Sequence, residues 1–161
     1  MRMWDSGTII SDSGNRREFD SGAVRDMAEG KGRCDLMPLR VIANILEDDV
    51  IYNIACAINM TKTVKCEYLK KAVRIFCADD AMWDSVLDLS KHFEAGAKKY
   101  GERNWEKGLP ESCYIDSAIR HYLKYRRGDT DEPHDRAFLW NIVCLMWTIE
   151  NIDSEQEATN K

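Results

Sequence analysis

The feature that most constrains this fold is the recurrence of apolar residues at helical spacing along most of the chain. Residues 64–77 carry one such stripe, which includes Leu69, Val73 and Phe76. Apolar residues three and four positions apart indicate an amphipathic helix, whereas strict alternation would indicate a strand. Few segments alternate, and residues 50–53 are the most ambiguous. The pattern predicts helices over residues 38–46, 48–59, 64–77, 81–100, 114–125 and 133–151, and therefore an all-α bundle of about five to six helices.

Helix boundaries and composition divide the chain into three parts. Gly101 follows Tyr100 at a natural helix end, and Pro133 suits the first turn of the last helix. Residues 1–30 are rich in Ser, Gly, Asp and Arg and predict an irregular N-terminal arm. We expect a single helical domain over residues 31–151 and a polar tail over residues 152–161.

The overall charge and the cysteines restrict the partners and the compartment. A net charge of −5 disfavours a nucleic-acid polymer or an anionic membrane as the main partner. No apolar run approaches the ~20 residues that span a bilayer, and no secretory signal is evident at the start. The 6 cysteines form no C-x-x-C pair and suit a reducing compartment. We therefore expect a cytoplasmic protein.

Polar residues beside apolar helix faces gather in the second half of the chain. A polar group near a core is unfavourable unless it is paired or binds a ligand. Two pairings need no ligand: Asp116 and Arg120, four residues apart, can form a salt bridge, and Asn141 can make a polar bond within the core. The alternative is a site that faces the bundle. Its candidate residues are His92, Glu94, Asp116, Arg120, His121, His134, Asp135 and Asn141.

Carboxylates on these helices suggest a metal site. Mg²⁺ prefers oxygen ligands, often one or two carboxylates together with substrate phosphates. Glu94, Asp116 and Asp135 are the predicted ligands for Mg²⁺ or Mn²⁺, and Asp131 is a further carboxylate nearby.

Two short segments carry cations that could bind an anion. In residues 29–35, Lys31 and Arg33 stand beside glycines, which let the backbone approach a phosphate closely; a charged linker is the alternative. Residues 98–105 mix cations with aromatic and amide groups, a combination that suits phosphate charge and base stacking. The candidates in this second segment are Lys99, Tyr100, Arg103, Asn104 and Trp105.

Several stretches together resemble a phage and prophage family of dATP/dGTP diphosphohydrolase-like proteins. They are residues 21–26, 30–38, 92–108, 116–122 and 128–141, and the run from His92 to Gly108 is the most specific. The resemblance covers most of residues 20–150. The exception is residues 45–85, which look like an insertion relative to shorter members. It implies an enzyme that converts dATP or dGTP to the monophosphate and pyrophosphate with a divalent metal, in the host cytoplasm if the gene belongs to a phage.

A wider resemblance, from Tyr122 to Trp147, is to the second half of the all-α MazG-type pyrophosphohydrolases. Those enzymes hold magnesium with E-x-x-E and E-x-x-D pairs and commonly assemble, which implies a homo-oligomer. Here Asn141 stands at the final acid and Phe138 at the acid before it, while Asp116 and Arg120 are nearest to the earlier pair. Either another set, such as Glu94, Asp116 and Asp135, holds the metal, or activity is reduced or lost.

The resulting hypothesis is metal-dependent hydrolysis of a purine nucleotide. Glu94 or His121 would activate the water, and His134 and Asn141 would face the substrate. Two alternatives stay open. One is an HD-type phosphohydrolase that uses the His134–Asp135 pair, and the other is a phage protein that binds and sequesters a nucleotide without catalysis. The remaining roles are phosphate binding by Lys31, Arg33, Lys99, Arg103 and Arg120, and base recognition by Tyr100, Asn104 and Trp105.

Overall fold

The computed structural model describes residues 12–78 and 80–159, with side chains described as far as Ile152. Within these residues the chain forms six α-helices and one short hairpin, which confirms the all-α class. The first eleven residues of the predicted arm lie outside the described part. The elements are β1 (Arg16–Glu18), β2 (Val24–Asp26), α1 (Leu39–Leu46), α2 (Asp49–Ala57), α3 (Lys62–Cys77), α4 (Met82–Tyr100), α5 (Glu111–Arg127) and α6 (His134–Thr159), with 3₁₀ turns at Cys34–Leu36 and Asn104–Lys107.

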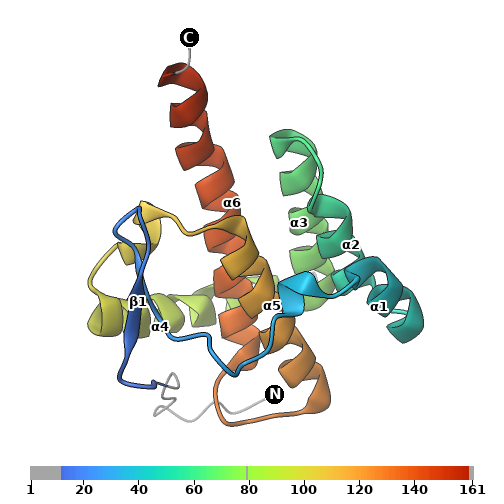
Figure 1. The fold of residues 1–161 in the computed structure, drawn as a ribbon. Coiled ribbons are helices and arrows are strands. Elements are labelled where there is room, and N and C mark those ends of the chain that lie inside the picture. The colour runs from blue at the N-terminus through green and yellow to red at the C-terminus, as the bar shows by residue number, and fades with distance from the viewer. Residues whose placement is uncertain (1–11, 79, 160–161) are drawn as a thin grey trace.

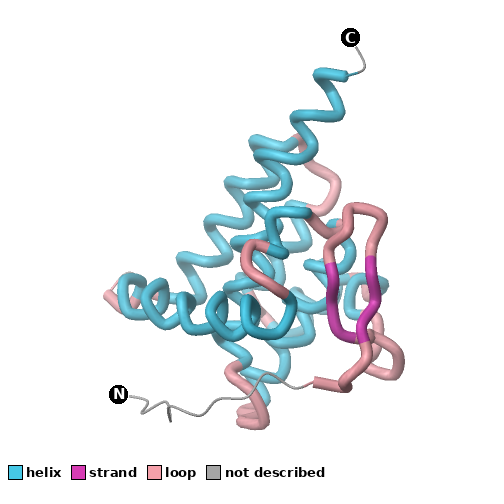
Figure 2. The backbone as a smooth tube through the Cα atoms, turned by 90° about the vertical axis from the view of Figure 1, so that its left-hand side faces the viewer, coloured by secondary structure: helices cyan, strands magenta, loops and turns pink. Residues whose placement is uncertain are grey.

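The helices are arranged around α6, the longest element (Figure 1). Helix α5 packs along α6, and α4 crosses it. Helices α1, α2 and α3 lie on the opposite side of α6 from the hairpin (Figure 1). Turned by 90°, the two strands form a small ribbon at one side of the helical body (Figure 2). The hairpin and α4 thus come together on the α5–α6 pair, although the hairpin lies far from all three helices in sequence.

The core forms where the apolar stripes of α5 and α6 meet. Tyr114 and Ile119 on α5 and Phe138 and Ile142 on α6 are fully buried. Burying such a side chain stabilises the fold by roughly 1.5–3 kcal/mol. Leu69 extends this core into α3. The predicted stripes therefore correspond to the real packing faces.

The N-terminal arm is more ordered than its composition suggests. Strands β1 and β2 pair antiparallel, with Arg17 opposite Arg25. The side chain of Asn104 holds β2 from its free edge: its Oδ1 accepts from Val24 N at 2.9 Å, and its Nδ2 donates to Val24 O at 2.9 Å. This amide satisfies both backbone groups of Val24, as a neighbouring strand would, and so explains an ordered strand without strand-like composition.

Helix α6 also differs from the prediction, because it continues to Thr159 instead of ending near Asn151. No Gly or Pro occurs after Pro133, and Glu, Gln and Ala in the final segment are good helix formers. Polar composition alone therefore did not mark a helix end. Two tryptophans of α6 find partners within the chain, since Trp147 packs on Trp105 and Trp140 lies near Phe93.

The described helices contain none that is both long and apolar enough to cross a membrane. The six cysteines are all free thiols.

Asp48 joins two layers of the bundle. It caps α2 by accepting from Ile51 N at 3.0 Å, and it accepts from the Tyr122 hydroxyl of α5 at 2.7 Å. Arg126 donates to the same carboxylate. Because Asp48 is buried, its removal leaves a helix end uncapped and the Tyr122 hydroxyl without an acceptor.

We expect Asp48→Ala to lower the free energy of unfolding by about 2–4 kcal/mol, the sum of a lost N-cap and an unsatisfied buried hydroxyl. Urea denaturation of the two proteins measures the difference. Tyr122→Phe is the matched control: it removes only the hydroxyl and should have the smaller effect, about 1 kcal/mol. An Asp48→Ala protein as stable as the wild type would contradict this role.

Candidate functional site

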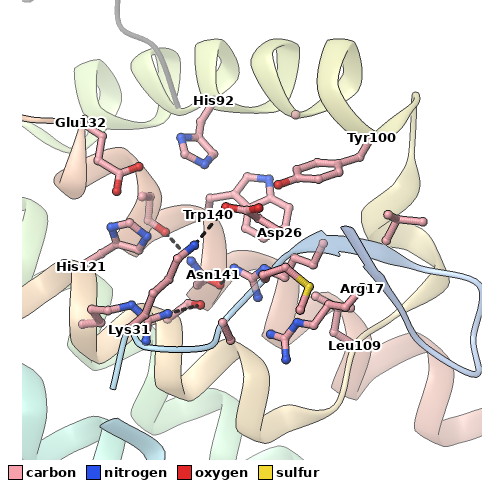
Figure 3. A pocket seen from close by; sticks show the side chains of 18 of the residues that line it. Arg17, Asp26, Lys31, His92, Tyr100, Leu109, His121, Glu132, Trp140 and Asn141 are labelled. Carbon is pink, nitrogen blue, oxygen red and sulfur yellow. Dashed lines mark hydrogen bonds and ion pairs between the residues drawn. The ribbon is translucent and has the colours of Figure 1, made fainter. Parts of the chain in front are cut away.

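A cavity of about 400 Å³ with converging polar groups lies between the hairpin, the segment after it and helices α4, α5 and α6. Figure 3 shows His121 and Glu132 at one end, Tyr100 and Arg17 at the other, and Trp140 and Asn141 between them. A concave site with a few convergent polar groups is the usual form of a ligand pocket. Its charged and histidine lining residues are Arg17, Arg25, Asp26, Lys31, His92, Arg120, His121, Lys124, Asp131 and Glu132.

Arg25 of β2 lies deep in this cavity. Its guanidinium donates to Asn141 Oδ1 at 2.7 Å and, more weakly, to Cys113 O at 3.4 Å. The Trp140 ring lies beside it, with its centroid 5.5 Å from the guanidinium carbon. Burial lowers the pKa of Arg25 from its ordinary value. Among the described residues, no carboxylate forms an ion pair with Arg25.

Three of the other cavity cations are paired with carboxylates. Lys31 reaches across the cavity to Asp26 at 3.0 Å (Figure 3), and Lys124 lies 3.3 Å from Asp131. Arg120 donates to Asp116 at 2.7 Å, as the salt-bridge alternative predicts. Glu132 is the exception among the acids, since its carboxylate makes no hydrogen bond or ion pair with any described residue. It is therefore available for a ligand.

Two histidines and a carboxylate form a hydrogen-bonded chain at the Glu132 end. His121 Nδ1 lies 2.9 Å from His134 Nδ1, and His134 Nε2 lies 2.7 Å from Asp131 Oδ1. The hydrogen bond from His134 lowers the pKa of Asp131 to about 2. This carboxylate is therefore ionised and accepts a hydrogen bond from His134 Nε2–H. With its Nε2 donating to Asp131, His134 can accept from His121 Nδ1–H at its Nδ1. His121 Nε2 is left with a lone pair, in a ring that lines the cavity.

The surroundings keep His121 in its neutral form. Burial lowers the pKa of His121 well below its ordinary value, and the nearby His134 and Arg120 act in the same direction. A neutral imidazole with a free lone pair can accept a proton at neutral pH. This arrangement is that of a general base.

His92 is a further cavity residue with an unused polar atom. Its Nδ1 is buried and has no hydrogen-bond partner, and burial lowers the pKa of His92 to about 4. Arg17 Nε is likewise buried without a partner. Buried polar atoms are nearly always satisfied in folded proteins. Two of these exceptions belong to residues that line one cavity.

The structure brings together about half of the residues predicted from the sequence. His134 does not line the cavity but supports His121 from behind, and the Asn141 amide binds Arg25. Asn104 lines it while its amide binds the Val24 backbone. The predicted residues in the cavity lining are Lys31, His92, Tyr100, Asn104, Arg120, His121, Asp131 and Asn141.

Other predicted residues lie elsewhere. Glu94 is exposed, pairs with Lys98 at 2.5 Å, and lines a separate hollow with Arg103 and Trp105. Arg33 pairs with Asp35 at 2.6 Å. Lys99 lies 3.6 Å from Asp12, outside the cavity lining.

The predicted metal ligands Glu94, Asp116 and Asp135 are not brought together. Asp116 accepts from Cys34 N at 2.6 Å and from Arg120, so it fastens the cationic segment to α5. Asp135 accepts from the neighbouring backbone amide of Arg136. Within the described part of the chain, the groups close enough to share an ion are His121–Glu132–His134 and Asp129–Asp131–His134, with ligand atoms within 4.8 Å of one another.

Sequence reasoning missed several lining residues, above all Arg17, Arg25 and Glu132. Arg25 and Asp26 lie in the stretch 21–26 that carries part of the family resemblance, so a signal was present. The signal for Glu132 was weaker, since one acid in a polar turn is usually solvated. Arg25 stands 116 residues from its partner Asn141 in sequence.

The fold and the cavity define an all-α protein with a pocket lined by several cations, with a candidate general base at one end. A comparison with protein families then assigns the family: residues 61–158, more than half of the chain, match the family described as "dATP/dGTP diphosphohydrolase, N-terminal". The chain belongs to this family and is therefore an enzyme of nucleotide hydrolysis. The match includes residues 61–85 of the segment interpreted as an insertion. Comparisons with curated proteins and with solved structures found no match.

Proposed function

We propose that this protein hydrolyses purine deoxynucleoside triphosphates, dATP or dGTP, to the monophosphate and pyrophosphate in a reaction that requires a divalent metal. One observation carries the proposal: a single cavity holds a neutral histidine, an unpaired carboxylate and several cations. The family match supports the substrate class. The overall negative charge is no obstacle, because the cations converge locally.

The protein's own residues divide the work along the cavity. Arg25, Lys31 and Arg120 bind the triphosphate oxygens and neutralise the charge that develops on them. His121 Nε2 takes the proton of the attacking water as the bond between the α- and β-phosphoryl groups breaks, and pyrophosphate carries away the electron pair. His134 and Asp131 fix the tautomer of His121 and stabilise the imidazolium that forms.

The purine base of the substrate lies at the end of the cavity opposite His121. Tyr100 and Trp140 offer aromatic surfaces for stacking, and both line the cavity (Figure 3). The unpartnered His92 Nδ1 provides a hydrogen-bonding atom near the Trp140 ring. A site that hydrogen-bonds a particular base edge discriminates strongly against bases that lack the matching group.

The residues present fit a divalent ion at Glu132. Its carboxylate lines the cavity, is unpaired among the described residues and lies within 4.8 Å of the His121 and His134 nitrogens. Mg²⁺ or Mn²⁺ often binds through one carboxylate together with substrate phosphates. The ion would supply neutralisation of the triphosphate charge.

The test is a substrate screen with separated products. Purified protein is incubated with dATP, dGTP, dCTP, dTTP or GTP in the presence of Mg²⁺, Mn²⁺ or EDTA. We expect a monophosphate and pyrophosphate from dATP or dGTP only when a metal is present. Release of inorganic triphosphate from the nucleoside would instead indicate the HD-type reaction. Tight binding with every nucleotide recovered intact would overturn the proposed hydrolysis and leave a binding protein.

A further inference from the structure

Arg25 combines three properties that are unusual together: it is charged, its guanidinium lies deep in a cavity, and no described carboxylate pairs with it. A buried guanidinium without a counter-ion is strongly unfavourable, because both its charge and its N–H donors lose water. Its contacts are with neutral groups, the Asn141 amide and the Trp140 ring. His92 and His121 line the same cavity.

The partner of Arg25 is a neutral amide that is fixed in orientation. Asn141 is 1% exposed, and its Nδ2 donates to Ala137 O at 2.7 Å. Its Oδ1 is thereby turned toward Arg25. An acid at this position would neutralise the guanidinium. The amide instead holds it in place and leaves its charge uncompensated.

The donors of Arg25 are only partly used. A guanidinium has five N–H donors, and the two contacts, with Asn141 and Cys113, leave the rest open. No Arg25 nitrogen is among the buried polar atoms that lack a partner, whereas Arg17 Nε, in the same cavity lining, is. Nη1 and Nη2 each have a partner, so it is the unpartnered Nε–H of Arg25 that reaches the cavity space.

We infer that Arg25, held by Asn141, is the main anion-binding group of this protein and binds a phosphoryl group of the ligand directly, without a metal. The inference deepens the proposed function and rests on it for the identity of the ligand. It also gives Asn141 a positioning role, since Asn141 acts on the ligand through Arg25. The planar fork of Arg25 suits two parallel hydrogen bonds to phosphoryl oxygens.

The experiment measures binding of inorganic tripolyphosphate in EDTA by isothermal titration calorimetry, so that neither metal nor hydrolysis contributes. The wild type should bind, and Arg25→Gln should weaken binding by about ten-fold or more, as expected for loss of charged hydrogen bonds. Asn141→Asp has nearly the same volume and places a carboxylate against Arg25. This variant should weaken the binding of tripolyphosphate to a similar extent, while its thermal midpoint shows that the protein is folded.

A matched control is Arg74→Gln, which removes one positive charge from the exposed surface of α3 and should bind as the wild type does. Deoxyguanosine, which carries no phosphate, should bind the wild type and both cavity variants equally. Wild-type affinity in both cavity variants, absence of tripolyphosphate binding to the wild type, or tighter binding in Asn141→Asp would overturn the inference.

The two proposals fail separately. Tripolyphosphate binding that depends on Arg25, without hydrolysis of any nucleotide, would overturn only the proposed function. Hydrolysis of dGTP with an unchanged KM in Arg25→Gln would overturn only the role of Arg25.

Discussion

Replacing His121 with asparagine is expected to reduce kcat by about 10²- to 10⁴-fold, the usual contribution of a general base. Asparagine retains a polar side chain that can still bond to His134 but cannot take a proton from water. KM for the nucleotide should change little, because the cations that bind the triphosphate remain. Steady-state kinetics with dGTP or dATP measure both constants.

The pH profile distinguishes a base from a structural residue. The pKa of His121 is depressed by burial, so the neutral, active form persists below the ordinary histidine value of 6.5. In the free wild-type enzyme, kcat/KM should therefore stay flat from pH 7 to 6.5 and fall only at lower pH, by ten-fold per unit below the pKa. The residual activity of His121→Asn should lack this acidic limb. An unchanged limb in the variant, or a kcat close to the wild type, would contradict the assignment.

Replacing Glu132 with glutamine is expected to raise the metal concentration needed for half-maximal activity by about ten- to a hundred-fold, the range found when groups that hold or orient a metal are lost. The amide keeps the size of the side chain and removes the charge that attracts the cation. Activity titrations with Mg²⁺ and Mn²⁺ from an EDTA-treated protein measure this shift. Excess metal should restore much of the wild-type rate.

The matched control for Glu132 is Glu67→Gln, which removes one carboxylate from the exposed surface of α3, where Glu67 pairs with Lys70. The metal titration of this control should coincide with that of the wild type. Equal shifts in both variants would mean that the total charge, and not a site at Glu132, sets the metal requirement. No shift in either variant would mean that the ion binds elsewhere.

The helices could be predicted from the sequence because each buries its own apolar stripe, a local property. The hairpin could not, because β2 depends on an amide 80 residues away in sequence, that of Asn104. The same limit applies to Arg25, whose partner Asn141 is 116 residues away. Pattern reasoning sees the spacing within one helix, whereas these contacts depend on how separate elements pack.

Helix geometry explains why Glu94 lies outside the cavity although His92 lines it. Residues two apart on an α-helix point about 200° apart, since each residue turns the helix by about 100°. His92, Gly96 and Tyr100 are spaced by four residues and share the cavity face, while Glu94 points to the other hollow. Proximity in sequence thus suggested a cluster that the helical turn separates.

The cavity is assembled from two parts of the chain, of which only one lies within the family match. The histidines, Glu132 and Asn141 lie within residues 61–158, the part that matches the family, whereas Arg17, Arg25, Asp26 and Lys31 come from the hairpin and the segment after it. A substitution in the hairpin would therefore change the arginines that line the cavity and leave the histidines and Glu132 unchanged. Because the Asn104 side chain binds the Val24 backbone, it fixes the hairpin, with these arginines, to the part of the chain that carries the histidines.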